Sequence, residues 1–194
     1  MWLILADYEI TIQNIVLTGS FSECIDLGVA NSKLAGSKCK WRRFPGLIFK
    51  LKVPSATFLL FRTGKFVCTG ATSEAQGHEA IVNFMAQLKT EAIVSTQCVF
   101  DYTVKNLVAS VTIGGVSISL EQFTHQFKSA LYEPEKFPAA IYKIDQPKAT
   151  FLVFLSGKLI CSGVKNEEAL KSIVKKFYQQ LLEKNTLEKV LNNY

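Results

Sequence analysis

Residues 44–74 read FPGLIFKLKVPSATFLLFRTGKFVCTGATSE, and residues 137–167 read FPAAIYKIDQPKATFLVFLSGKLICSGVKNE. The two copies align without a gap at a constant offset of 93 residues, and 15 of their 31 positions are identical. A match of this length indicates an internal repeat. A repeat constrains the overall architecture more strongly than the secondary-structure propensities of single residues do. The sequence therefore predicts two copies of one half-domain, residues 1–93 and residues 94–194, packed closely into one pseudo-twofold domain.

The composition limits the class of protein. The chain has 194 residues, of which 48% are hydrophobic, and this is enough to build a core. No apolar run approaches the ~20 residues that a membrane span needs. The first ten residues lack the basic region of a signal peptide. We therefore expect a soluble intracellular protein with no membrane partner.

The cysteines and histidines do not form a recognisable chemical site. Five cysteines are an odd number, and their spacing is not that of metal ligands. Cys68 and Cys161 occupy equivalent repeat positions inside expected strands, where a thiol usually acts as a small buried hydrophobic group. The two histidines are isolated, and the acids are scattered. The sequence predicts no catalytic residue, no metal and no cofactor.

Basic residues are concentrated in the first repeat. The net charge is +6, and the stretch from Lys38 to Lys65 contains eight basic residues and no acid. A basic run is usually only a solvated surface. Aromatic residues interleave with this one, and that pattern favours a polyanionic partner. The basic residues are Lys38, Lys40, Arg42, Arg43, Lys50, Lys52, Arg62 and Lys65, and the aromatic residues are Trp41, Phe44, Phe49, Phe58 and Phe61.

Each half is predicted to follow the same order of elements: a strand, a helix, three strands joined by short turns and a long helix. In the first half these are Ile10–Thr18, Ser22–Leu34, Leu47–Lys52, Ala56–Arg62, Lys65–Ala71 and Ser73–Lys89. In the second half they are Tyr102–Thr112, Leu120–Leu131, Ala140–Ile144, Ala149–Leu155, Lys158–Val164 and Asn166–Lys184. Residues 185–194 are expected to extend the last helix or to fray.

The repeated strands are apolar on both faces. Side chains alternate between the faces of a strand, and both sets from Ala56 to Phe61 are largely apolar. Two helices per half can cover only one face, and an exposed apolar face marks a binding site. The alternative is a sheet covered on both sides, which normally needs helices between the strands. The open face is expected to hold Asn14, Val16, Leu59, Phe61, Val67 and Thr69, and then Asn106, Val108, Leu152, Phe154, Ile160 and Ser162.

Such a surface suits the minor groove of duplex DNA. The groove floor of A·T pairs offers acceptors, so amide and hydroxyl donors among apolar side chains can read it, while the guanine amino group would clash. Phenylalanines at the margins can insert between base steps and kink the duplex. Lysines that recur in both halves can meet the flanking phosphates. The marginal phenylalanines are Phe44, Phe61, Phe137 and Phe154, and the recurring lysines are Lys50, Lys65, Lys143 and Lys158.

Several strings resemble the conserved core of the TATA-box-binding protein (TBP) family over nearly the full length of the chain. They are IQNIV and VKNLV, FLLFRTGKFVCTGATSE and FLVFLSGKLICSGVKNE, and YEPEKFPAAIY. The resemblance implies an α+β fold, the TBP saddle, in which a curved antiparallel sheet of two pseudo-twofold repeats carries helices on its convex face. It also implies a nuclear general transcription factor that binds and bends TATA-like, A·T-rich double-stranded DNA and nucleates the pre-initiation complex.

The roles of the family's residues are carried over by position. The resemblance makes Phe44, Phe61, Phe137 and Phe154 intercalating residues. It assigns minor-groove contacts to Asn14, Val16, Leu59, Val67, Thr69, Asn106, Val108, Leu152, Ile160 and Ser162. It assigns phosphate contacts to Arg43, Lys50, Lys65, Lys143 and Lys158. Tyr132, Glu133 and Glu135 match the family's surface for transcription factor IIB, although YEPE could also be an ordinary turn.

Departures from the family pattern leave some partners open. The first repeat has AGSKCKWRRFP in place of a stirrup like YNPK, and the helix Ser73–Lys89 is not strongly basic. Transcription factor IIA and TBP-associated factors are therefore possible partners, and a homodimer is possible when DNA is absent. One alternative is a specialised TBP-related factor with an altered DNA preference or a saddle used mainly for protein partners. Another is the TBP-like domain of a DNA glycosylase or RNase H enzyme.

Overall fold

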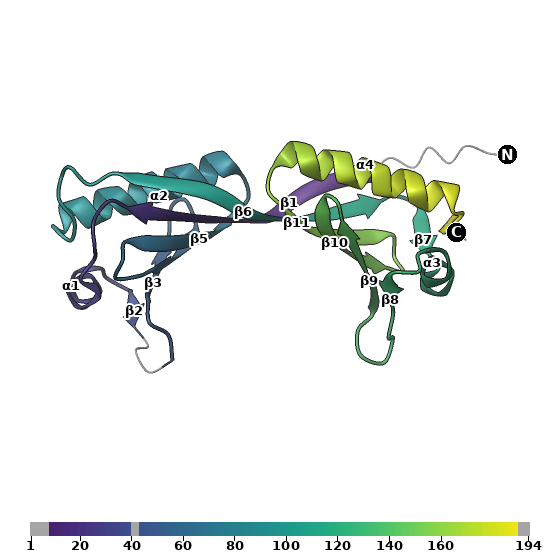
Figure 1. The fold of residues 1–194 in the computed structure, drawn as a ribbon, viewed down its shortest axis with the longest axis horizontal. Helices are drawn as coiled ribbons and strands as arrows, with labels where there is room; N and C mark the ends of the chain where they lie inside the picture. Colours follow the sequence, from purple (N-terminus) through teal and green to yellow (C-terminus); the bar gives the residue numbers. More distant parts are fainter. Residues whose placement is uncertain (1–7, 40–42, 190–194) are drawn as a thin grey trace, which may run out of the picture. The chain divides into compact units, whose positions relative to one another are not determined.

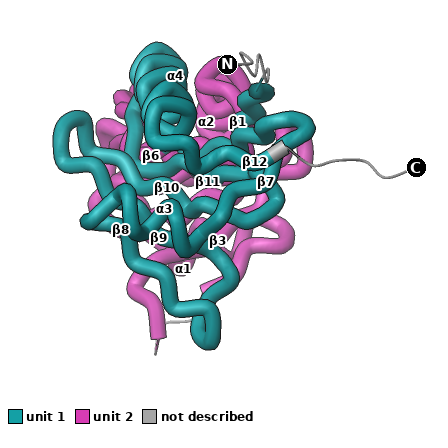
Figure 2. The backbone as a smooth tube through the Cα atoms, turned by 90° about the vertical axis from the view of Figure 1, so that its right-hand side faces the viewer, with its two compact units in different colours: residues 1–12, 107–194 teal, residues 13–106 magenta. Residues whose placement is uncertain are grey.

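The computed structural model describes residues 8–39 and 43–189. The chain divides into two compact units, shown in Figure 2: unit 1 combines Met1–Ile12 with Leu107–Tyr194, and unit 2 is Gln13–Asn106. The first and sixth strands are each divided between the two units. The predicted repeat boundary between residues 93 and 94 stays a prediction.

The strand order in unit 2 is β2-β3-β4-β5-β1-β6, and the pairs from β2 through to β1 are antiparallel. Its strands are β1 (Tyr8–Phe21), β2 (Lys38–Cys39), β3 (Leu47–Leu51), β4 (Ala56–Leu60), β5 (Lys65–Ala71) and the start of β6 (Phe100–Ile113). Its helices are α1 (Leu27–Lys33) and α2 (Glu74–Thr90). The long helix α2 lies along one face of this sheet and contacts β5 (Figure 1).

Unit 1 repeats this arrangement with the strand order β1-β6-β11-β10-β9-β8. Its further elements are β7 (Val116–Ile118), α3 (Leu120–Gln126), β8 (Ala130–Leu131), β9 (Ala139–Asp145), β10 (Lys148–Phe154), β11 (Lys158–Val164), α4 (Glu167–Glu183) and β12 (Leu187–Lys189). The long helix α4 lies along one face of the sheet and contacts β11 (Figure 1). Among the described residues, no helix is long and apolar enough to cross a membrane.

Equivalent phenylalanines build the core of each unit. The ring of Phe84 in α2 stacks on Phe58 of β4 at a centroid distance of 4.3 Å. The ring of Phe177 in α4 stacks on Phe151 of β10 at 4.2 Å. All four side chains are fully buried, and each pair recurs at the repeat offset of 93 residues. Each long helix is therefore fixed to one face of its sheet, and its apolar face supplies most of the burial.

The ends of the long helices follow from their caps. The Ser73 hydroxyl accepts a hydrogen bond from the Gln76 amide, and the Asn166 side chain accepts one from the Ala169 amide. These bonds satisfy amides that have no partner inside the helix. Both predicted long helices are confirmed to within one residue, and the predicted bounds of β5 and β11 are confirmed without change.

Three sequence-based expectations are wrong in detail. The helix predicted over Ser22–Leu34 begins only at Leu27, because the Asp26 side chain caps it by accepting from the amides of Gly28 and Val29. The helix predicted over Leu120–Leu131 ends at Gln126, and β8 then pairs with β9. Within the tail, β12 pairs with β7 instead of extending the last helix.

Candidate nucleic-acid interface

The strands of each unit sort their side chains between a covered face and an uncovered one. In unit 2, the side chains on the α2 side, such as Phe58, Phe66 and Cys68, are at most 1% exposed. Their neighbours on the opposite face are only half-buried, and they are Leu59, Phe61, Val67 and Thr69. In unit 1, Leu152, Phe154, Ile160 and Ser162 are likewise half-buried. The predicted alternation is confirmed, and the aliphatic face opposite each long helix is accessible.

Strand pairing arranges this uncovered face in two rows per unit. In unit 2 the pairs Ile48–Leu59, Leu59–Val67 and Val67–Thr18 connect four strands in one row. The corresponding row in unit 1 contains Ile141, Leu152, Ile160 and Ser110. The second row contains Lys50, Thr57, Thr69 and Val16 in unit 2, and Lys143, Thr150, Ser162 and Val108 in unit 1. Each row thus combines aliphatic groups with hydroxyls.

Sequence reasoning omitted part of these rows. It did not select Ile48, Thr57 and Thr18, or their equivalents Ile141, Thr150 and Ser110, although all six are half-buried on the uncovered face. Side-chain alternation applied to Leu47–Leu51 would have placed Ile48 beside Lys50 on one face. Alternation along β4 already puts Thr57 on the same face as Leu59, although it was not included among the expected contacts. We add these six residues to the candidate interface.

Asn14 is held in one orientation on the uncovered face of unit 2. Its Oδ1 accepts hydrogen bonds from the Thr69 hydroxyl at 3.0 Å and from the Gly70 amide at 2.8 Å. Both donors therefore occupy the oxygen, so the Nδ2 hydrogens point away from them and act as donors. Asn106 and Ser162 hold the equivalent positions in the second repeat, and Asn106 is also half-buried.

A β-bulge places the Gly70 amide against Asn14. The pairing between β1 and β5 shifts register between Ile15 and Val16, and Gly70 is the residue skipped. Its φ of 103° belongs to the left-handed region, where glycine is strongly favoured. Bulges of this kind redirect one backbone group locally. Gly163 has a φ of 99° at the equivalent shift in unit 1.

The predicted intercalating residues lie together as one pair in each unit. The rings of Phe44 and Phe61 have centroids 5.6 Å apart and an interplanar angle of 62°. The rings of Phe137 and Phe154 are 6.3 Å apart, also at 62°. Three of these side chains are half-buried, and Phe137 is 39% exposed. Each unit therefore presents a pair of accessible rings at one end of its uncovered face.

A tight turn holds Phe61 in place. The Phe61 amide donates to the Lys65 carbonyl at 2.9 Å, and the Gly64 amide donates to the Phe61 carbonyl at 3.0 Å. Gly64 has a φ of 78°, and a Cβ there would stand 2.3 Å from the Glu23 carbonyl oxygen. Only glycine fits this position. The predicted hairpin turns at Thr63-Gly64 and Ser156-Gly157 are confirmed.

The predicted phosphate-binding residues all have exposed side chains. They are Arg43, Lys50, Lys65, Lys143 and Lys158. Lys50 and Lys143 stand at matching ends of the second rows, since they pair with Thr57 and Thr150. Lys40, Trp41 and Arg42 of the basic stretch lie outside the described residues.

The segment YEPE forms a turn between β8 and β9. The amides of Lys136 and Phe137 both donate to the Glu133 carbonyl at 2.9 Å. Glu133 also forms an ion pair with Lys136 at 2.7 Å. Tyr132 is half-buried, and Glu133 and Glu135 are exposed. Their role in binding a protein partner stays a prediction.

Two buried cysteines, Cys68 and Cys161, have raised pKa values. Burial raises the pKa of Cys68 to about 11 and that of Cys161 to about 12, because the thiolate would lose its hydration. Both thiols are therefore protonated at neutral pH, which is the unreactive form. Among the described residues, no group of three or more His, Cys, Asp or Glu side chains could hold a metal ion.

Comparisons with known proteins agree on one family. The family model described as "Transcription factor TFIID (or TATA-binding protein, TBP)" matches residues 9–90 and 101–184. The chain is 36% identical to TATA-box-binding protein 2 of Methanosarcina mazei over 183 residues, which are 91% of this chain and 97% of that protein. It is 35% identical to the TATA-box-binding protein of Methanothermobacter thermautotrophicus over 180 residues, 92% of this chain and 98% of that protein.

A solved structure gives the same result for the fold. The TBP of Methanococcus jannaschii superposes with a TM-score of 0.83 at 34% identity, and the match covers 90% of this chain and 99% of that one. The predicted fold class is thereby confirmed: it is an α+β fold of the TBP type, with antiparallel strands in two repeats and helices on one face of each. On these matches over nearly its whole length, the chain belongs to the TATA-binding protein family of transcription factors.

Proposed function

We propose that this chain is a general transcription factor, not an enzyme, that binds TATA-like duplex DNA through the minor groove and bends it. The observation that carries the proposal is the orientation of Asn14, whose oxygen accepts from Thr69 and Gly70 and whose NH₂ group is therefore left to donate. The minor groove of A·T pairs presents only acceptors, adenine N3 and thymine O2. A fixed donor among aliphatic side chains matches that pattern.

The rows of the uncovered face support selectivity for A·T pairs. Leu59, Val67 and Ile48 are neighbours there and provide no hydrogen-bond acceptor on their side chains. A guanine N2 amino group pressed against them would lose its hydration without gaining a partner. An unsatisfied buried donor costs about 1–3 kcal/mol. Each G·C pair in the bound element therefore weakens binding.

The paired phenylalanines support bending. Wedge side chains unstack a base step at a cost of a few kcal/mol and kink the duplex toward the major groove. One pair per unit, Phe44 with Phe61 and Phe137 with Phe154, provides one wedge per repeat. Flexible TA steps lower the deformation cost, which gives specificity at positions without hydrogen bonds.

The charges at the margins support contacts with the DNA backbone. Arg43, Lys50, Lys65, Lys143 and Lys158 are exposed and would neutralise phosphates beside each wedge and each row. Phosphate contacts release bound counterions, so affinity falls as salt rises.

Protein partners form a further part of the proposal. The acidic turn at Glu133 and Glu135 would bind transcription factor IIB, and transcription factor IIA and TBP-associated factors would bind elsewhere. The uncovered aliphatic faces would also support a homodimer without DNA. A nuclear location stays a prediction for this chain, whose relatives named above come from archaea.

An electrophoretic mobility shift tests the proposal. We expect the protein to retard a duplex with a TATA-like element and not a duplex of equal length in which G·C pairs replace that element. A second titration with transcription factor IIB should give a slower ternary complex only on the first duplex. Equal retardation of both duplexes, or of neither, would refute sequence-selective binding. If the uncovered face binds only protein partners, neither duplex would be retarded.

A further inference from the structure

The two hairpin tips that carry Phe61 and Phe154 differ in charge. We define the unit 2 tip as Arg43, Phe61, Arg62, Thr63 and Lys65, and the unit 1 tip as the residues 93 positions later, Lys136, Phe154, Leu155, Ser156 and Lys158. The aromatic and small residues are matched between the tips. The cations are not, because a leucine that is 60% exposed replaces Arg62.

One of the two remaining cations of the unit 1 tip is engaged in an ion pair. Lys136 is the counterpart of Arg43, and it forms an ion pair with Glu133 at 2.7 Å. Residue 40 in the first repeat, the counterpart of Glu133, is a lysine. Among the described residues of the unit 2 tip, no cation forms an ion pair. The unit 2 tip therefore offers three unpaired cations, while the unit 1 tip offers only Lys158.

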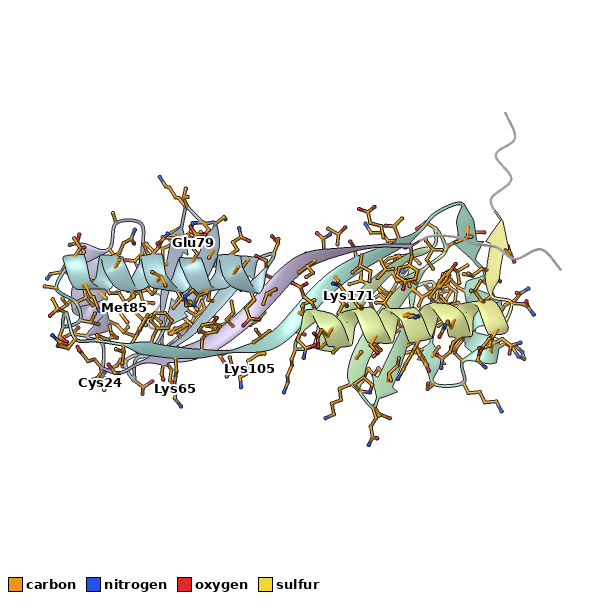
Figure 3. All side chains as sticks on the ribbon, turned by 90° about the horizontal axis from the view of Figure 1, so that it is seen from above. Cys24, Lys65, Glu79, Met85, Lys105 and Lys171 are labelled. Carbon is orange, nitrogen blue, oxygen red and sulfur yellow. The ribbon has the colours of Figure 1, made fainter. Side chains whose placement is uncertain are left out.

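Arg62 stands at an accessible edge of the wedge. It lines two surface hollows, of about 770 and 760 Å³, together with Pro45 and Thr63. Phe61 and Lys65 line the first hollow, and Cys24 lines the second. Figure 3 shows Lys65 and Cys24 along the same edge of unit 2. Arg62 thus follows the wedge residue Phe61 directly in sequence, and its side chain borders open space.

We propose that Arg62 of the unit 2 tip binds a phosphate of the duplex that flanks the A·T-rich element, and that Leu155 leaves the unit 1 tip without this contact. This inference rests on the proposed function. Arginine suits the role because its planar group donates two parallel hydrogen bonds to one phosphate. If Phe61 inserts at the last base step of the element, the neighbouring Arg62 lies beyond that step, next to the flanking DNA. Affinity then depends on flanking DNA at one end of the element only.

The first experiment locates the end bound by unit 2. The exposed Cys24 accepts an iron chelate that cleaves nearby DNA, in a Cys39→Ser variant that removes the other accessible thiol. Cleavage on a duplex with long flanks marks the end where unit 2 lies. Duplexes shortened at that end should bind more weakly, and duplexes shortened equally at the other end should bind as the full duplex does.

The second experiment exchanges the residues that distinguish the tips. Each phosphate contact contributes about −0.9 to the slope of log affinity against log salt. Arg62→Leu should make that slope shallower by about 0.9 on the full duplex and should have no effect when the unit 2 flank is absent. Leu155→Arg should steepen the slope by about 0.9. It should also make affinity depend on the flank at the unit 1 end. Circular dichroism of both variants checks that they are folded.

The outcomes separate this inference from the proposed function. If the unaltered chain does not bind the TATA-like duplex, the proposed function fails. If it binds selectively but loses equal affinity on shortening either flank, only the asymmetry of the tips is refuted. An Arg62→Leu variant with an unchanged salt slope, or with a loss that does not depend on the flank, would overturn the inference as well.

Discussion

The Thr69 hydroxyl donates a hydrogen bond to Oδ1 of Asn14 at 3.0 Å, between neighbouring strands on the uncovered face of unit 2. This contact fixes the orientation of the Asn14 amide, because a donor of the protein occupies Oδ1 and the Nδ2 hydrogens remain as donors. The Gly70 amide reinforces it at 2.8 Å. A side chain held in this way loses little rotamer freedom on binding, which favours affinity and selectivity together.

Reversing the chemistry of Asn14 should weaken recognition. Asn14→Asp replaces the NH₂ donor with a carboxylate oxygen, which would be repelled by the acceptors and the phosphates of the groove. We expect affinity for the TATA-like duplex to fall at least about tenfold, equal to about 1.4 kcal/mol, in a fluorescence anisotropy titration. The matched control is Gln13→Glu, which adds the same charge at the neighbouring exposed residue of the same strand. Equal losses in the two variants would show that charge alone acts.

Removing the bond that orients Asn14 should have a smaller effect. Thr69→Val keeps the shape of the side chain and its place in the row but deletes the hydroxyl. One hydrogen bond is worth about 0.5–1.5 kcal/mol, so we expect affinity to fall about twofold to tenfold. Thr57→Val, at the paired position on β4, is the control because the donors to Oδ1 of Asn14 are Thr69 and Gly70 and not Thr57. If Thr57→Val costs as much as Thr69→Val, orientation of Asn14 is not the cause.

The wedge residues should control the bend and not the stability. Phe61→Ala or Phe154→Ala removes one of the paired rings and should reduce energy transfer between dyes on the two ends of a bound duplex. Val82→Ala, on the exposed side of α2, should leave the bend unchanged. An unaltered bend in both phenylalanine variants would contradict the wedge role.

The core phenylalanines should behave in the opposite way. Phe84→Ala and Phe177→Ala each remove a fully buried ring that stacks between a helix and the sheet. We expect each to lower the free energy of unfolding by about 3–5 kcal/mol in a urea titration. Phe154→Ala, at a half-buried ring, should lower it much less. Similar losses at Phe84 and Phe154 would mean that the uncovered face is not accessible.

The buried thiols should make the fold less stable at high pH. Burial raises the pKa of Cys68 to about 11 and that of Cys161 to about 12, whereas an unfolded thiol has a pKa of about 8.5. Between about pH 8.5 and 11 the unfolded chain releases these protons first, so the free energy of unfolding decreases as the pH rises. Below that range both states keep the protons and the effect is absent.

Urea titrations at several pH values between 8 and 10.5 measure this dependence. The informative quantity is the difference from a Cys68→Ala, Cys161→Ala double variant, because this difference isolates the two thiols. That variant should lose stability less steeply as the pH rises. Parallel curves for the two proteins would show that the thiols do not contribute.

Repetition made most of the fold predictable. The pattern that places Phe58 under α2 also places Phe151 under α4, so each prediction had a second copy to support it. The errors occurred where the copies differ or where a distant contact decides. Asp26 delays the start of α1 by capping it, and β12 forms only because β7 offers an edge. Neither contact follows from side-chain periodicity.

The candidate interface was predictable in its faces but not in its details. Alternation along each strand places Ile48, Leu59 and Val67 on one face, but only the pairing across strands shows that they form one row. The hydrogen bonds that orient Asn14 depend on a bulge at Gly70, which side-chain alternation along the strand does not predict. The hollows beside Arg62 depend on how Pro45 and Thr63 surround it.

Binding to a duplex in which inosine·cytosine replaces every A·T pair of the element tests the central claim most directly. Inosine·cytosine has the minor-groove face of A·T, without the guanine amino group, and a major-groove face close to that of G·C. The uncovered faces predict that this duplex binds within a few fold of the TATA-like duplex. Loss of binding to the level of the G·C duplex would show that the protein does not read the minor groove.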